Sequence, residues 1–572
     1  MRKRLLTLTL SLLTLAAQGT IKNPMLWADV PDPDVIRVGD TYYMVTTTMH
    51  LMPGAPIMQS RDLEHWETIG YLFDRLDDSP RYDLLEGTVY GRGQWATSLK
   101  YHDGRFYALF SPNESGDMGR TYIMTAPEAR GPWTLLSRLP HFHDATLFFD
   151  DDDRVYVVYG TGEMVELSRD MTQVIEGSHV QLFQREADET GILEGSRVVK
   201  HDGRYYLLMI SQVWGVPGRH RREVCYRADD IRGPYEKKTI LETDFGGFPH
   251  VGQGTIVDTE CGHWYGIIFQ DRGGVGRVLT LMPCRWTDGW PMLGDEEGRI
   301  PESLTPDPSP SSLTPCPSPI GEGSDYLGGI VGSDDFNPPT STPHAQGLIT
   351  PLSNRRGAGG EAGQAARALA SLWQWNHNPI DTAWSLTERP GFLRLKTCRV
   401  VPNLYLAPNT LTQRMEGPGC SGVVTIDVSH MRDGDCCGLA AFNGDSGVLT
   451  IKKKGRKLYI EMSEQSVALD PKNKAVTAVD ERIVESTELS SIHQSPSTIH
   501  LKLTADFRPG RDTANFYYST DGTTWTQIGS HDYKMQFDYR RFFMGTKFAI
   551  FNYATRKTGG YIDVDAFEYT RE

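Results

Sequence analysis

The sequence has little positive charge, few cysteines and no long apolar run beyond its N-terminus. Lys+Arg number 58 against 73 Asp+Glu, a formal net charge of −15, which argues against a protein that coats the phosphates of nucleic acid. Eight cysteines in 572 residues are too few for a disulfide framework, and no CxxC pair or Cys/His cluster indicates zinc. Apolar residues make up 39%, so a sizeable core is feasible and wholesale disorder is excluded.

The N-terminus has the pattern of an export signal. Arg2-Lys3-Arg4 precede an apolar run over residues 5–17, and small residues follow in Ala17-Gln18-Gly19, where a signal peptidase would cut. The apolar run is shorter than the ~20 residues that a membrane span needs, and no cysteine adjoins the cut to carry a lipid. Residues 1–19 are therefore predicted to be a signal peptide, and the mature protein is expected to be secreted or periplasmic without a membrane span.

Glycine (57) and proline (34) are abundant, as turn-rich β architectures require, and five segments repeat one pattern. Each segment runs through a short apolar strand and an Asp/Gly turn, and returns through an aromatic-rich strand. The segments begin at Asp32, Trp95, Asp144, Glu194 and Gln253. Since each has room for a second hairpin, the repeats predict five four-stranded blades, which form a β-propeller over residues 22–300. A β-sandwich with accidental internal similarity is the alternative.

The five starting residues occupy equivalent positions, at the beginning of the first strand of each blade. Because the first strands of a propeller surround its central channel, their side chains should converge at one mouth of the channel. Three of them, Asp32, Asp144 and Glu194, are carboxylic acids. Crowding of like charges raises the pKa of one acid and keeps it protonated near neutral pH, so this set predicts general acid–base catalysis.

A second domain follows the repeats. Residues 302–327 are rich in Pro, Ser and Gly and predict a linker, and residues 337–370 predict a disordered insertion; a functional Pro-rich docking segment is the alternative. Residues 328–572 otherwise contain strand after strand with Asp-Gly turns, as in 514–525 and 561–569, which predicts a two-sheet β-sandwich. The predicted fold class is all-β, a five-bladed propeller followed by a sandwich.

Paired acids in the second domain could bind a structural calcium ion. They are Asp334 with Asp335, and Asp563 with Asp565. Carboxylate oxygens are the hard ligands that calcium prefers. Solvated surface acids are the alternative interpretation.

Several motifs give the chain a family resemblance. They are Ala28-Asp-Val-Pro-Asp32-Pro, Trp95-Ala-Thr-Ser-Leu, Asp144, Glu194-Gly and Gly276-Arg277. In this order and spacing the chain resembles glycoside hydrolase family 43, five-bladed enzymes that release arabinose and xylose from plant polysaccharides. The resemblance covers residues 22–296 and resumes in the C-terminal part, which is similar to the concanavalin A-like jelly roll attached to many β-xylosidases. It implies Asp32 as general base, Glu194 as general acid, and Asp144 as the residue that tunes and orients the acid.

The resemblance also implies substrate-binding positions. Arg277 would reach into the channel toward the sugar, with a surface ion pair as the alternative. Trp95 would face the sugar, with blade packing as the alternative. His50 would lie at the rim of the sugar subsite, and Gln253, which opens the fifth repeat, would line the same mouth.

One departure from the family pattern concerns a channel ion. Many members carry a histidine directly before the Gln-Gly of blade five, linked to an ion or water in the channel. Here Gly252 stands in that place, and His250 is the nearest candidate ligand. A bound calcium in the channel is therefore in doubt for this chain.

The sequence thus predicts an exported, inverting, exo-acting glycosidase that removes arabinofuranosyl or xylosyl residues from plant cell-wall glycans and requires no cofactor. Asp32 and Glu194 open non-adjacent blades, which suits the roughly 6.5–9.5 Å that inverting enzymes leave between acid and base. Two rivals stay open. A non-catalytic carbohydrate-binding propeller would not need all three acids, and a retaining propeller hydrolase acting on fructosides would use its first aspartate as nucleophile.

Overall fold

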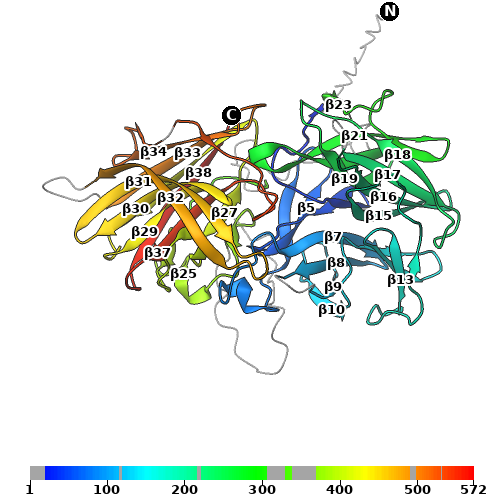
Figure 1. Ribbon diagram of the computed structural model, residues 1–572, viewed down its shortest axis with the longest axis horizontal. Helices are drawn as coiled ribbons and strands as arrows, with labels where there is room; N and C mark the ends of the chain where they lie inside the picture. Colours follow the sequence, from blue (N-terminus) through cyan, green and yellow to red (C-terminus); the bar gives the residue numbers. More distant parts are fainter. Residues whose placement is uncertain are drawn as a thin grey trace, which may run out of the picture.

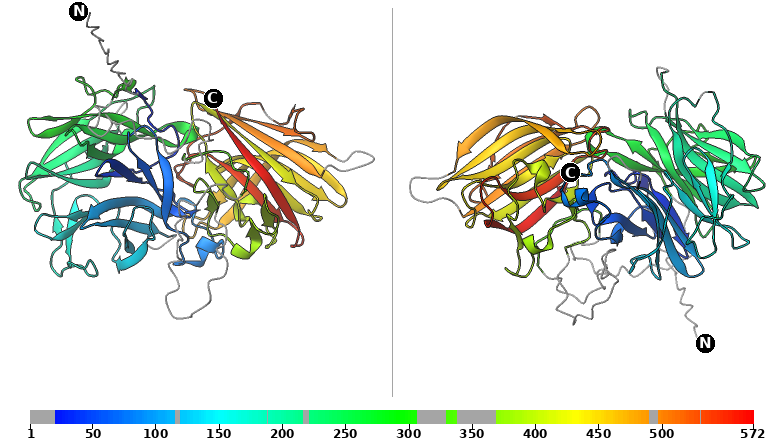
Figure 2. Two further views of the ribbon diagram at one scale, coloured as in Figure 1. Left: turned by 180° about the vertical axis from the view of Figure 1, so that it is seen from behind. Right: turned by 60° about the horizontal axis from the view of Figure 1, so that its bottom comes forward.

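The computed structural model describes residues 20–114, 119–187, 189–215, 221–305, 329–337, 369–489, 497–529 and 531–572. Within these ranges the chain is all-β and has no α-helix. Its short 3-10 helices are η1 (Pro80–Asp83), η2 (Gly273–Val275), η4 (Asp381–Ala383) and η5 (Leu404–Leu406). Two domains lie side by side, one blue to green and one yellow to red (Figures 1 and 2). The predicted signal peptide, most of the predicted linker and most of the predicted insertion lie outside the described residues.

The first domain consists of five antiparallel sheets of four strands, each hydrogen-bonded in chain order. Blade one has β2 (Asp34–Val38), β3 (Thr41–Val45), β5 (Gly54–Ser60) and β6 (Glu67–Phe73). Blade two has β7 (Gly93–His102), β8 (Arg105–Asn113), β9 (Thr121–Ala126) and β10 (Thr134–Leu139). Blade three has β11 (Thr146–Phe149), β12 (Val155–Tyr159), β13 (Glu163–Leu167) and β14 (Val180–Gln181). Blade four has β15 (Leu193–His201), β16 (Arg204–Gln212), β17 (Arg221–Ala228) and β18 (Glu236–Leu241). Blade five has β19 (Val251–Asp258), β20 (Trp264–Asp271), β21 (Arg277–Thr287) and β22 (Trp290–Leu293).

The Asp-Gly turns seen in the sequence form tight hairpins between the first two strands of a blade. Asp103 and Gly104 have φ of 48° and 74°, and Asp202 and Gly203 have φ of 48° and 75°. Positive φ at both central positions is the type I′ turn, whose twist matches that of the flanking strands. These turns set the register between the first two strands of blades two and four.

The first strands of the five blades, β2, β7, β11, β15 and β19, contact one another in a closed ring. They therefore surround the central channel, and the predicted five-bladed propeller is confirmed. The two ends of this domain pair with each other, β1 (Ile21–Lys22) with β23 (Ser303–Leu304). The prediction that a linker begins at residue 302 is wrong at this point, because residues 303–304 form a strand paired with β1.

The second domain is a sandwich of two eight-stranded sheets. The first, in spatial order, has β32 (Val476–Glu488), β31 (Lys457–Leu469), β30 (Asp445–Lys454), β29 (Asp435–Phe442), β37 (Lys547–Ala554), β27 (Leu411–Arg414), β24 (Gln374–Asn376) and β4 (Leu51–Met52). The second has β25 (Trp384–Ser385), β26 (Leu393–Lys396), β38 (Tyr561–Arg571), β28 (Gly419–Asp427), β33 (Thr498–Asp506), β34 (Thr513–Ser519) and β35 (Thr526–Gln527), with β36 (Tyr533–Lys534) also paired to β34.

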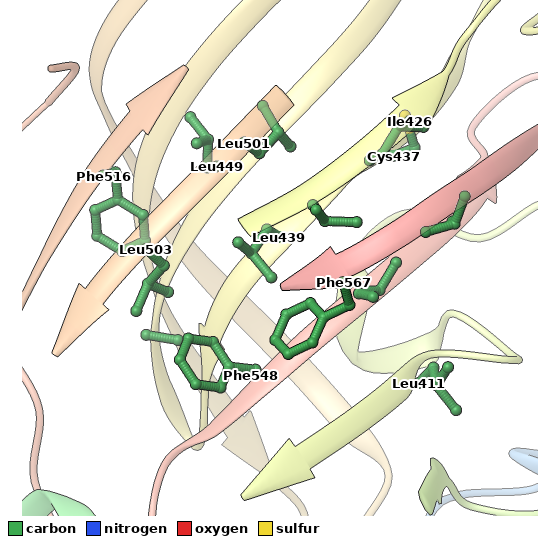
Figure 3. Close-up of a cluster of buried hydrophobic side chains, with 14 of the residues drawn as sticks. Leu411, Ile426, Cys437, Leu439, Leu449, Leu501, Leu503, Phe516, Phe548 and Phe567 are labelled. Carbon is green, nitrogen blue, oxygen red and sulfur yellow. The ribbon is translucent and has the colours of Figure 1, made fainter. Parts of the chain in front are cut away.

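Alternation of apolar and polar residues builds the core between these sheets. In β33 every second residue is buried, which places Leu501 and Leu503 in the interior. They belong to one cluster with Leu439 and Leu449 of the facing sheet (Figure 3). Period-two alternation with one buried face is the pattern expected of a sandwich strand.

The two domains share a sheet. The short strand β4 comes from blade one, between β3 and β5, but pairs with β24 of the sandwich, Met52 opposite Trp375 and Leu51 opposite Asn376. The domains are therefore joined by backbone hydrogen bonds as well as by packing. Among the described residues, no helix is long and apolar enough to cross a membrane, and the described cysteines form no disulfide.

Candidate active site

The structure brings the three predicted carboxylates to one mouth of the channel. Asp32 and Asp144 each stand two residues before the first strand of their blade, and Glu194 is the second residue of β15. Both aspartates have positive φ, 54° and 45°, a conformation that Asp tolerates better than most residues. The charges of Glu194 and Asp32 both act on Asp144, so the convergence predicted from the repeat register is what the structure has.

Asp144 has a strongly perturbed pKa. Burial is the largest cause, and the neighbouring charges of Glu194 and Asp32 raise the pKa of Asp144 further, against the opposing effect of His143, to about 7. A carboxyl group in this state can hold or release a proton near neutral pH. Asp144 can therefore exchange a proton at the pH at which the other groups of this cluster work.

His143 is a member of this cluster that the sequence analysis missed. Its Nε2 lies 3.2 Å from Oε2 of Glu194. Burial alone would lower the pKa of His143, but the carboxylates of Asp144 and Glu194 outweigh burial and raise this pKa to about 9. As an imidazolium, His143 donates a hydrogen bond from Nε2 to Oε2 of Glu194. The one signal in the sequence was its position directly before Asp144.

Asp32 lies in a different environment from Glu194. Thr47 donates its hydroxyl to Oδ2 of Asp32 at 2.7 Å, and Arg277 donates from Nη1 to Oδ1 at 3.2 Å. The Asp32 side chain is 10% exposed, whereas that of Glu194 is 36% exposed. Asp32 is thus enclosed by a hydroxyl group and a guanidinium, whereas Glu194 is more open to solvent.

Arg277 is held by the sandwich as well as by the propeller. Its side chain is buried, so a surface ion pair is excluded. Nη2 donates to the carbonyl oxygen of Phe543 at 3.2 Å, and the guanidinium carbon lies 4.8 Å from the centre of the Phe543 ring. The guanidinium thus joins Asp32 to a loop of the second domain.

Trp95 and Gln253 lie at the same mouth. The half-buried Trp95 ring has its centre 5.7 Å from that of His143 and 6.3 Å from that of Phe543. Gln253 is buried against Gly195, where a Cβ would come within 2.2 Å of its side-chain carbon Cδ. Gly195 also has φ of 71°, a conformation that suits glycine. Only a glycine after Glu194 leaves this space for Gln253.

His50 is not at the rim of an open subsite, and that prediction is wrong. It is wholly buried, with its ring 4.8 Å from that of Tyr90, 5.0 Å from His377 and 5.4 Å from Phe542. Burial lowers the pKa of His50 to about 3, so its ring is neutral. The second domain covers this position, which no local pattern in the sequence could indicate.

The loop between β36 and β37 brings further residues of the sandwich to the mouth. Phe543 belongs to it, and so does the exposed Tyr539, whose hydroxyl donates to Oδ2 of Asp271 at 2.7 Å. Lys547, at the start of β37, forms an ion pair with Asp29 at 2.7 Å. Asp29 in turn accepts the backbone N–H of Arg277 at 3.0 Å. Phe543, Tyr539 and Lys547 were not predicted from the sequence.

The acids proposed as calcium ligands in the sandwich do not fit that role. Asp563 is ion-paired with both Arg389 and Arg394, and Asp334 accepts hydrogen bonds from Trp373 Nε1 and the backbone N–H of Phe336. Their oxygens are already occupied.

The remaining metal candidates give no ligand set either. Asp335 and Asp565 are exposed, as the alternative of solvated surface acids expects. The backbone carbonyl of His250 accepts the N–H of Asp271 at 3.1 Å. In the part of the chain that the structure describes, one trio has ligand atoms within 4.8 Å of one another and could hold a metal ion, namely His143, Asp144 and Glu194.

Comparison with known proteins places this site in a family. The family model for glycosyl hydrolases family 43 matches residues 21–291, and the model for the beta-xylosidase C-terminal concanavalin A-like domain matches residues 365–570. A putative beta-xylosidase of Xylanibacter ruminicola is 30% identical, over 90% of this chain and 83% of that protein. The chain belongs to glycoside hydrolase family 43.

The chain is also similar to other proteins over most of its length. A non-reducing end alpha-L-arabinofuranosidase of Bacteroides ovatus is 25% identical over 82% of this chain and 83% of its own length. The solved structure of a bifunctional GH43-CE protein of Bacteroides eggerthii superimposes with a TM-score of 0.80 and 36% identity. The match covers 97% of this chain but 64% of that longer chain.

Proposed function

We propose that this protein is an inverting, exo-acting glycosidase that removes arabinofuranosyl or xylosyl residues from the non-reducing ends of plant cell-wall glycans. Membership of family 43 supports glycoside hydrolysis, and the names of its relatives support a pentoside as substrate. The observation that carries the proposal is the contrast between two carboxyl groups at one mouth. Asp32 is enclosed by a hydroxyl and a guanidinium, whereas Glu194 is open to solvent and bonded to His143.

This contrast assigns a role to each acid. Glu194 protonates the departing glycosidic oxygen, while Asp32 removes a proton from the water that attacks the opposite face of the sugar. Asp144 and His143 determine how readily Glu194 holds its proton. His143 lies within hydrogen-bond distance of Glu194, 3.2 Å between Nε2 and Oε2. Neither step uses a redox cofactor or a nucleotide.

The second domain supports action on a chain end. The loop that carries Phe543 and Tyr539 comes from the sandwich, yet it contacts Arg277 and Asp271 at the mouth of the propeller. One side of the mouth is therefore covered by protein. A site closed on one side accommodates the end of a glycan more readily than its middle.

The stereochemistry of the first product tests the proposal. Aryl α-L-arabinofuranoside and aryl β-D-xyloside would be incubated with the enzyme and followed by NMR from the first turnover. The expected product has the opposite anomeric configuration from the substrate, because water attacks directly. Retained configuration would exclude Asp32 as a base and favour the retaining alternative. Absence of turnover on both glycosides and on pentose oligosaccharides, with binding intact, would favour a carbohydrate-binding protein.

A further inference from the structure

Trp214 is the most exposed large apolar side chain in the part of the chain that the structure describes. Trp214 is 62% exposed. A single exposed apolar residue is ordinary on a protein surface, so exposure alone assigns no role. The position of Trp214 and the way in which its ring is held are more informative.

The strand register places Trp214 at the mouth that holds Glu194. Strands β15 and β16 are antiparallel, with Glu194 opposite Ile210. The backbone N–H of Gln212 still bonds to Ile192 at 2.9 Å, so the two chains run on together past the sheet. Trp214 follows Ile210 by four residues, a distance of at most about 14 Å along the chain. This is the span of a few sugar units from Glu194.

Thr190 holds the backbone of Trp214, and the indole ring packs on Gly191. The backbone N–H of Trp214 donates to the hydroxyl of Thr190 at 3.2 Å, and that hydroxyl donates to the Trp214 carbonyl at 3.3 Å. Gly191 lies under the ring, because a Cβ at this position would be 2.6 Å from Cδ1 and 2.8 Å from Nε1 of Trp214. The ring therefore rests on the backbone of Gly191 while much of it faces solvent.

The proposed reaction indicates which part of the substrate would lie beside Trp214. A general acid delivers its proton to the leaving oxygen, so the leaving part of the glycan extends from the side of Glu194. Trp214 is on the same blade as Glu194, and Asp32 is on another. A pyranose ring with equatorial hydroxyls has a flat apolar face, which matches the flat apolar surface of an indole.

We propose that Trp214 is a stacking platform for the leaving part of the substrate, a chain of pyranose sugars such as β-1,4-linked xylose. This inference rests on the proposed function, because it takes the orientation of the glycan from the role of Glu194. The platform binds the sugar before and during bond cleavage alike. It therefore acts mainly on KM, because contacts made equally in the ground state and the transition state leave kcat unchanged.

The test compares a short and a long substrate. KM and kcat would be measured for Trp214→Ala and Trp214→Phe with xylotetraose and with an aryl pentoside. We expect Trp214→Ala to raise KM for xylotetraose about tenfold, with a smaller change for the aryl pentoside and partial recovery in Trp214→Phe. Tyr101→Ala is the matched control, since Tyr101 is 43% exposed but lies at the opposite end of β7 from Trp95. Equal losses on both substrates, or a result like that of Tyr101→Ala, would overturn the proposal.

A binding measurement separates this inference from the proposed function. Calorimetry with xylotetraose would compare Asp32→Asn with the double variant Asp32→Asn/Trp214→Ala, neither of which needs to turn over substrate. Weaker binding by the double variant supports the platform even if wild-type hydrolysis proves retaining. Equal affinity of the two variants, or no binding by either, contradicts the platform whatever the wild-type enzyme hydrolyses.

Discussion

Lys547 of the sandwich and Asp29 of the propeller form a buried ion pair across the domain boundary, with 2.7 Å between Nζ and Oδ2. Burial alone would raise the pKa of Asp29, but Lys547 and Arg277 hold it below its usual value. Burial lowers the pKa of Lys547 to about 8, helped by the nearby Arg414 and Arg277. Several cations thus surround one carboxylate, which also accepts the backbone N–H of Arg277. The second domain is in this way connected to the arginine that contacts Asp32.

Lys547→Met should destabilise the protein and slow the reaction. Removing one partner of a buried pair leaves an uncompensated charge, which costs about 3–5 kcal/mol. The loss of kcat follows because Asp29 no longer fixes Arg277 beside Asp32. Chemical denaturation and steady-state kinetics would measure both effects. Lys472→Met, at an exposed lysine, is the control, and equal behaviour of the two variants would contradict a structural role for the pair.

His143→Gln should move the alkaline limb of the pH–rate profile to higher pH. The imidazolium of His143 lowers the pKa of Asp144, so its removal lets Asp144 hold its proton to higher pH. A shift of about one pH unit is expected for loss of an adjacent charge. His141→Gln is the control, because its ring is 6.4 Å from that of His143 and bonds to Gly119 instead. An alkaline limb that stays in place or moves down would refute this role.

Asp144→Asn should stabilise the folded protein above neutral pH while lowering activity. The pKa of Asp144 is about 7 in the folded chain against an ordinary 3.8, so between these values the folded state binds more protons than the unfolded state. The contribution of Asp144 to stability therefore falls as pH rises through this range and stays low above it. Melting temperature should rise at pH 8 but not at pH 4, by roughly 2–4 °C per kcal/mol regained. Asp153→Asn, on an exposed turn of the same blade, should raise it at neither.

Gly195→Ala should be far more damaging than Gly203→Ala. Both glycines have nearly the same positive φ, 71° and 75°, so alanine at either site costs about 1–2 kcal/mol of backbone strain. At Gly203 nothing lies within 4 Å of an added Cβ, whereas at Gly195 the methyl group meets Gln253. The extra loss of melting temperature and kcat in Gly195→Ala measures that contact. Similar results for the two variants would mean that Gln253 moves aside freely.

Glu194→Ala should lose activity according to the leaving group. General acid catalysis contributes about 10²–10⁴-fold, and a dinitrophenolate departs without a proton. Hydrolysis of xylo-oligosaccharides should therefore fall by that factor, while a dinitrophenyl glycoside should be largely spared. Asp32→Ala should abolish both reactions, because the Asp32 carboxylate activates the water in each. Equal losses on the two substrates for a folded Glu194→Ala would mean that another group donates the proton.

The repeat register predicted the placement of Asp32, Asp144 and Glu194 because it depends on local chemistry. Each blade is specified by alternating strands and an Asp-Gly turn within a short stretch of chain, and the positions equivalent in the pattern become equivalent in space. The same reasoning put Gln253 at the mouth. Nothing further was needed for these residues than the knowledge that first strands surround the channel.

Contacts between the domains could not be predicted in this way. Lys547 and Asp29 are 518 positions apart, and Phe543 lies in a loop without any periodic pattern. His50 was misplaced for the same reason, since its burial depends on His377 and Phe542 of the other domain. His143 was missed although it adjoins Asp144, because its contact with Glu194 depends on the packing of two blades.

Because strand β4 lies in the chain of blade one but pairs with β24, the sandwich is not complete without the propeller. A sandwich cut away from the propeller would lose β4 and present β24 as a bare sheet edge, and exposed edges pair with other chains. Self-association is the consequence expected of such a fragment. A chimera that exchanges the sandwich for that of another enzyme would need to exchange residues 51–52 with it, so the sequence of blade one constrains which partners the propeller accepts.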